Sequence, residues 1–88
     1  MEPDSLLELA DDAAAASEYE TSYHLLMAAL HLAEHRGSHD AVMRIGAAGR
    51  RIGVAAKKRG HAAIFDQFDV RAEAVRLRLE SGRSRTRA

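Results

Sequence analysis

The sequence predicts an all-α fold, a small bundle of four helices arranged as two consecutive antiparallel hairpins. The only proline is Pro3, and β-branched residues are sparse along the 88 residues. Apolar residues instead recur at the three- and four-residue spacing of helix faces, in four segments separated by short breaks. A chain of this length forms one domain, which we place at residues 1–81. Such a domain buries only about 60–65% of the surface that its unfolded chain exposes.

The first two predicted helices cover residues 5–17 and 19–36. Pro3 and Asp4 supply a start signal ahead of the first helix. The second helix is apolar around roughly 220° of its circumference, counted at 100° per residue. An arc of that width is typical of a helix with neighbours on two sides. We therefore expect the second helix to lie between the first and the third.

The third predicted helix covers residues 40–59, behind a capping sequence at Ser38. Its inner face consists mostly of small residues. Gly46, Gly49 and Gly53 together oppose helix formation by roughly 3 kcal/mol relative to alanine. Close backbone packing against the second helix is the compensation that we expect.

The fourth predicted helix covers residues 61–81 and buries one apolar stripe against the bundle. A second stripe lies well round the helix from the first and would face water in an isolated chain. It supplies the predicted self-association residues Val70, Ala74 and Leu77. Residues 82–88 contain three arginines and no apolar anchor. We predict that they form a disordered basic tail.

The first hairpin alternates large and small residues at fixed spacings. Leu6, Leu9 and Ala10 lie in its first helix, and Ser22, Leu26 and Ala29 lie in its second. These spacings resemble the tetratricopeptide-type repeat, a helix-turn-helix unit of about 34 residues. The bulky signature residues of that family are absent from the matching positions. The resemblance implies a protein-binding scaffold or chaperone built from stacked hairpins.

Net charge is zero, but the charges are divided along the chain. Residues 1–40 hold nine acidic residues against Arg36 alone, which gives −8, and residues 41–88 hold twelve bases against four acids, which gives +8. Opposite halves of this kind attract each other within one molecule or between two copies. The third helix also carries a basic face at heptad spacing, formed by Arg44, Arg51 and Lys58.

Histidine is the only residue type that suggests a metal site. His31 and His35 are four residues apart on one helix face, a spacing at which two imidazoles can share a Zn²⁺ ion. The polar face of an exposed helix is the simpler explanation for them, so we predict no metal and no cofactor. The chain shows no nucleophile–histidine arrangement and no phosphate-binding glycine loop. We therefore predict no catalytic residue and do not expect an enzyme.

Two functions fit these features, and a non-enzymatic protein–protein interaction module, either an adaptor or a small chaperone, is favoured. Its partner would be another protein or a second copy of the chain. The predicted contacts are Tyr19, Tyr23 and Met27, at the edge of the wide apolar arc, because aromatic residues and methionine are enriched in interfaces. The same three residues would otherwise complete the core under the fourth helix.

The alternative is a nucleic-acid-associated regulator that uses the basic third helix and the tail. No aromatic residue interleaves with these bases, which makes nucleic acid the less favoured partner. The chain lacks cysteine, a signal-peptide pattern and an apolar run long enough to span a membrane. We expect a cytoplasmic protein that does not contact membranes.

Overall fold

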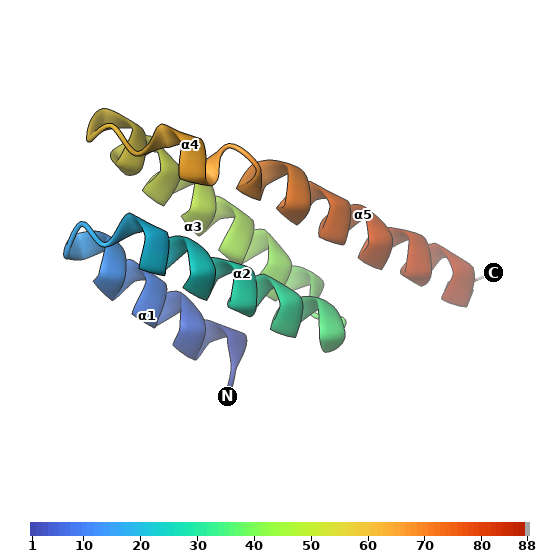
Figure 1. The fold of residues 1–88 in the computed structure, drawn as a ribbon. Helices are drawn as coiled ribbons and strands as arrows, with labels where there is room; N and C mark the ends of the chain where they lie inside the picture. Colours follow the sequence, from blue (N-terminus) through green and yellow to red (C-terminus); the bar gives the residue numbers. More distant parts are fainter. Residues whose placement is uncertain (88) are drawn as a thin grey trace.

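The computed structural model describes residues 1–87, with side chains for residues 1–61 and 63–82. Within residues 1–87 every regular element is helical: α1 (Pro3–Ala15), α2 (Tyr19–His35), α3 (His39–Lys58), α4 (Ala62–Phe65) and α5 (Phe68–Arg87). The helices α1 and α2 form one antiparallel hairpin, and α3 forms a second with α4 and α5 (Figure 1). The predicted all-α bundle of two consecutive hairpins is confirmed.

Each of the first three helices stops at a residue with left-handed backbone conformation. Gly37 (φ 67°) follows α2, Gly60 (φ 85°) follows α3, and Ser17 (φ 62°) plays the same part after α1. The next amide donates a hydrogen bond back into the last turn, as the N–H of His61 does to the carbonyl of Ala56 at 2.8 Å. This Schellman motif satisfies the free carbonyls of each helix end and reverses the chain direction.

The first three helices lie within two residues of the predicted ranges, but the fourth differs in two respects. A break at residues 66–67 divides the predicted helix 61–81 into α4 and α5, and it places Phe65 and Phe68 against α3. In addition, α5 continues to Arg87, through most of the segment predicted as a disordered tail. Extending an existing helix avoids the free-energy cost of helix nucleation. The prediction of a disordered tail used amino-acid composition alone and did not include this effect. Ala88 lies outside the described residues.

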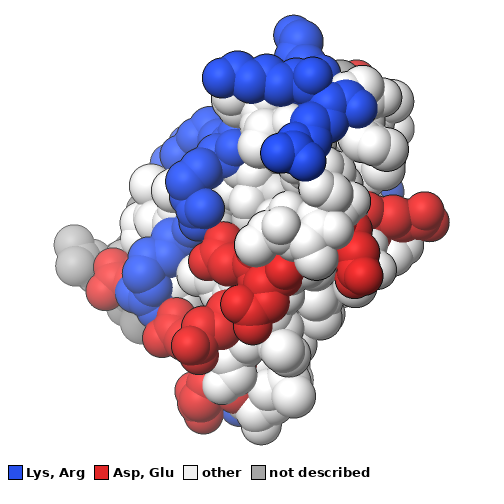
Figure 2. Space-filling model, turned by 90° about the vertical axis from the view of Figure 1, so that its left-hand side faces the viewer, with Lys and Arg blue, Asp and Glu red and all other residues white. Residues whose placement is uncertain are grey.

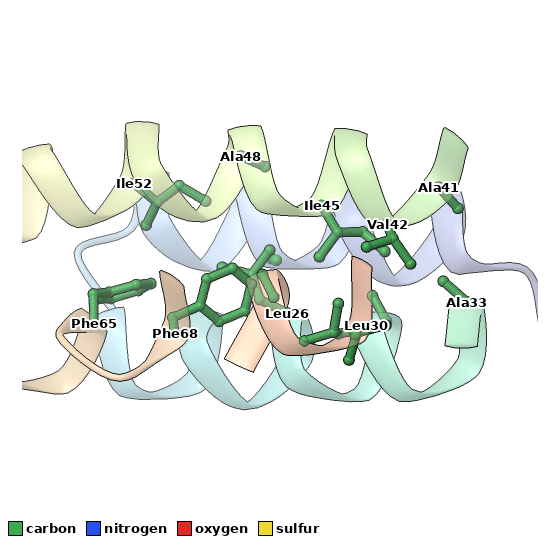
Figure 3. Close-up of a cluster of buried hydrophobic side chains, with 14 of the residues drawn as sticks. Leu26, Leu30, Ala33, Ala41, Val42, Ile45, Ala48, Ile52, Phe65 and Phe68 are labelled. Atoms are coloured by element: carbon green, nitrogen blue, oxygen red, sulfur yellow. The ribbon is translucent and has the colours of Figure 1, made fainter. Parts of the chain in front are cut away.

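The core lies between α2 and α3 and is closed by α4 and α5 (Figure 3). Leu26 and Leu30 of α2 are fully buried, and so is Phe68 of α5. Because α2 contacts α1 on one side and α3 on another, it is sandwiched as its wide apolar arc predicts. Leu25 and Leu32, at the edge of that arc, are only half-buried.

The glycines of α3 permit a close approach, but to a different element from the one predicted. A Cβ atom at Gly49 would lie 2.1 Å from Cε1 of Phe68, and one at Gly53 would lie 3.2 Å from Cβ of Phe65. The predicted compensation by packing against α2 is therefore wrong, because these glycines face α4 and α5. Burial of a phenylalanine side chain stabilises by roughly 1.5–3 kcal/mol. That offsets the cost of about 1 kcal/mol for each glycine in the helix.

Candidate protein-interaction surface

A groove runs along the seam between α2 and the α4–α5 segment. Its first part is a hollow of about 370 Å³ lined by Tyr23 of α2 and Ile64 of α4, among others. A second hollow, about 260 Å³, lies on the next turns of α2 beside α5 and includes Met27 and Val75. The two hollows therefore follow one another along the seam, each with apolar side chains on its floor, and we refer to them together as the groove. Polar side chains border it: Glu20, His24, His31, Glu34, Gln67, Arg71 and Arg78.

The three predicted contact residues occupy three different environments. Tyr19 is only 5% exposed, and its ring centroid lies 5.4 Å from that of His61. Tyr23 is half-buried, with its ring packed edge-on against Phe65 at 5.8 Å while it also lines the groove. Met27 is half-buried in the groove floor. Tyr19 thus completes the core, whereas Tyr23 and Met27 remain accessible to a partner.

The far wall of this groove was not predicted from the sequence. Ile64 and Arg71 line it, together with Val75. None of these three residues is among the contact residues predicted from the sequence. The amphipathic pattern of α5 shows which side is apolar, but it does not show which edge of that side lies beside α2.

The predicted self-association stripe lies on the outer face of α5. Val70 is 69% exposed and Leu77 is 52% exposed, while Ala74 between them is half-buried. The expectation that this stripe faces water is confirmed for Val70 and Leu77, whereas Ala74 lines the second hollow beside α2. Its part in association stays a prediction.

The basic face of α3 is paired with α1. Arg44 donates from Nη2 to Oδ1 of Asp4 at 3.1 Å, and Arg51 donates in the same way to Asp11 at 3.0 Å. In each pair the two residues are 40 positions apart in sequence, so both pairs are consistent with the same register of α1 against α3. Lys58, the third residue of this face, has no ion-pair partner among the described side chains.

The two charged halves of the chain therefore meet within one molecule. Besides the two aspartate–arginine pairs, Arg78 donates from Nε and Nη2 to Glu34 at 2.6 and 3.1 Å. Figure 2 shows the end of the molecule at which α1 and α3 terminate, where basic side chains gather over one part and acidic side chains over the part beside it. Of the two alternatives for the charge split, the intramolecular one is present in the structure.

Ion pairing lowers the pKa of three glutamates. The hydrogen bonds from Arg78 lower the pKa of Glu34, and those from Arg76 lower the pKa of Glu73. The pKa of Glu80 is lowered first by its hydrogen bond with His39, at 3.1 Å, and then by Arg76. These shifts follow from surface pairs that bridge helix turns or neighbouring helices. They do not identify an acid–base pair of the kind used in catalysis.

The two histidine candidates for a metal site lie on the exposed side of α2. His31 and His35 are both exposed on α2, and His31 borders the groove. In the described part of the chain, no group of three or more His, Cys, Asp or Glu residues is placed to hold a metal ion. The same residues include no helix with the length and apolar character to cross a membrane.

No model of a known protein family matches the chain, and no curated protein or solved structure is significantly similar to it. The resemblance to tetratricopeptide-type hairpins therefore stays a prediction from residue spacing. The surfaces described above are the basis for a proposed function.

Proposed function

We propose that the chain is a non-enzymatic protein–protein interaction module that binds an amphipathic helix of a partner protein in the groove between α2 and α5. The observation that supports this most directly is the run of two hollows, with half-buried Tyr23 and Met27 on an apolar floor. A concave apolar groove with a polar border is the arrangement of helix-in-groove recognition. Along α2 the groove extends from Glu20 to Glu34. At 1.5 Å per residue this is about 21 Å, or about four turns of a bound helix.

The groove border indicates the charges of the partner segment. Arg71 has no ion-pair partner in the described part of the chain. A carboxylate on the partner would fit beside it. Among the described side chains Glu20 pairs only with His24, at 3.9 Å, so a basic residue of the partner fits at that end. Glu34 and Arg78 neutralise each other at the other end, where the partner helix needs no charge.

Panning a library of helical peptides against the protein tests this proposal. We expect the selected peptides to be amphipathic and to lose about tenfold in affinity with Met27→Ala, since truncation at the centre of an interface costs about 1–2 kcal/mol. Met43→Ala is the matched control, because Met43 is 45% exposed on α3 outside the groove. Circular dichroism of both variants verifies folding. Selected peptides that bind the Met27 and Met43 variants equally would contradict the proposal.

A nucleic-acid-associated regulator is less well supported. Arg44 and Arg51, which would contact phosphates, are already paired with Asp4 and Asp11. Phosphate binding would replace one ion pair by another, in a domain without net charge. We expect no binding to random duplex DNA even at low salt. A steep salt-dependent affinity that disappears when both arginines become alanine would favour the regulator.

A further inference from the structure

The outer face of α5 carries an apolar stripe whose two large residues no other helix covers in the described structure. It consists of Val70, Ala74 and Leu77, and Val70 and Leu77 are 69% and 52% exposed. The buried residues Phe68 and Ala72 of the same helix point to the core. At 100° per residue the two stripes lie about 180° apart. A second helix can therefore lie along α5 without displacing α2 or α3.

The two edges of this stripe carry opposite charges, and on the acidic edge Arg76 forms ion pairs with both glutamates. Arg71 and Arg78 repeat at heptad spacing on one edge, and Glu73 and Glu80 repeat at the same spacing on the other. With Val70 and Leu77 taken as d positions of a heptad, the arginines occupy e positions and the glutamates occupy g positions. Charges at e and g decide the partner and the orientation of paired helices.

This charge pattern is complementary in only one orientation. In a parallel pair of helices each g residue faces the e residue five positions on in the other copy, so Glu73 would face Arg78 of the second copy. In an antiparallel pair e faces e and g faces g, which would oppose arginine to arginine and glutamate to glutamate. Arg78 uses Nε and Nη2 for Glu34, so its Nη1 hydrogens remain for a second carboxylate.

We propose that α5 is a self-association surface on which two copies of the chain pair in parallel, related by a twofold axis along α5. The occupant is a second copy because the charges that border the stripe complement those of the same stripe. With two large exposed side chains per copy, the contact belongs to the weak class of interfaces, below about 1,200 Å². This surface shares Arg71, Ala74 and Arg78 with the groove between α2 and α5, but its apolar contacts Val70 and Leu77 lie outside that groove.

Single cysteines test the orientation, because the chain has none of its own. Gln67→Cys and Ser81→Cys place thiols at two a positions that are separated by about 21 Å along the helix. In a parallel pair each introduced cysteine faces the same cysteine of the second copy. Both variants should therefore form disulfide-linked dimers under mild oxidation. Ala15→Cys, at an exposed residue of α1, is the control for random collision.

We expect the yield of disulfide-linked dimer to be about tenfold above that of the control at both positions. A tenfold ratio corresponds to a contact free energy of about 1.4 kcal/mol, which even a weak specific interface supplies. An antiparallel pair can bring at most one of the two positions together. Dimer formation at only one position, or at the level of the Ala15 variant, would overturn the parallel arrangement.

Sedimentation equilibrium of the unmodified chain tests association itself. We expect the average mass to rise towards that of a dimer with increasing concentration. Leu77→Lys should weaken the dimer about tenfold or more, because it places a charge in the contact. Val54→Lys should leave it unchanged, since Val54 is similarly exposed (58%) but lies on α3. A monomer at all concentrations, or equal effects of the two variants, would refute the proposal.

Discussion

At Gly49 the absence of a Cβ atom decides how closely α3 approaches α5. The ring of Phe68 fills the space, and a Cβ atom would lie 2.1 Å from its Cε1 and 2.3 Å from its Cδ1. Phe68 is fully buried, so its ring has no solvent-filled space into which to move. At Gly46, on the same face, the nearest side-chain atoms would be 3.8 Å away, which is ordinary van der Waals contact. Of these two glycines, the packing requires only Gly49.

We expect opposite effects of alanine at these two positions. Gly49→Ala should lower the free energy of unfolding by about 1–3 kcal/mol, because overpacking of the core outweighs the better helix propensity. Gly46→Ala should raise it by up to about 1 kcal/mol, because only the propensity changes. Urea unfolding followed by circular dichroism measures both. Equal stability of the two variants would show that Phe68 does not occupy this space.

Between elements, exposed charges fix the register of α1 against α3. Asp4 pairs with Arg44, and Asp11 pairs with Arg51, at the same sequence offset. The four side chains are between 42% and 68% exposed, so each pair contributes only about 0.2–1 kcal/mol. The two pairs together disfavour other registers of α1 against α3, because a shift of one helix turn would break both pairs at once.

Exchanging these charges tests the register. Arg44→Asp with Arg51→Asp should lower the free energy of unfolding by about 1–2 kcal/mol, since aspartate then faces aspartate in both pairs. Adding Asp4→Arg and Asp11→Arg should restore most of the loss. Urea unfolding at low salt measures the effect, and about 1 M salt should reduce it. If the fourfold variant is no more stable than the double variant, the two helices are not paired in this register.

For the whole molecule, the division of charge along the chain makes stability depend on ionised carboxylates. Among the described side chains, three pairs join a base of the second half to an acid of residues 1–40: Arg44 with Asp4, Arg51 with Asp11, and Arg78 with Glu34. The long-range attraction between the halves thus acts within each copy. The proposed pairing of α5 depends instead on the charges at the e and g positions of that helix.

Acid should destabilise the fold. The pKa values of Glu34, Glu73 and Glu80 are all lowered from their ordinary value of 4.5. On acidification the unfolded chain binds protons first. The stability from these groups is therefore fully present above about pH 4.5 and is lost as the pH falls through their lower folded-state values.

Urea unfolding at a series of pH values between about 7 and 3 measures this loss. Glu34→Gln should make the decline shallower, because it removes one of the three shifted groups. Glu8→Gln is a matched control, since Glu8 is exposed on α1 and forms no ion pair within the described residues. A free energy of unfolding that stays constant down to pH 3 would contradict the prediction.

The sequence by itself determined the helical class, the ends of the first three helices and the sandwiched position of α2. These features depend on local signals: the apolar arc of α2, the glycines at 37 and 60, and the Ser38 cap, whose Oγ accepts a hydrogen bond from the N–H of Ala41 at 3.3 Å. Helix propensity, capping and amphipathicity act over a few residues and can therefore be predicted from them.

Only the tertiary structure decided which residues of neighbouring helices meet. It placed the glycines of α3 against Phe65 and Phe68, buried Tyr19 while leaving Tyr23 and Met27 in a groove, and paired the basic face of α3 with α1. The physical reason is that these contacts join residues as much as 40 positions apart, and their free energy depends on interhelical distances. Those distances are set when the whole core packs, and a periodic pattern within one helix does not contain them.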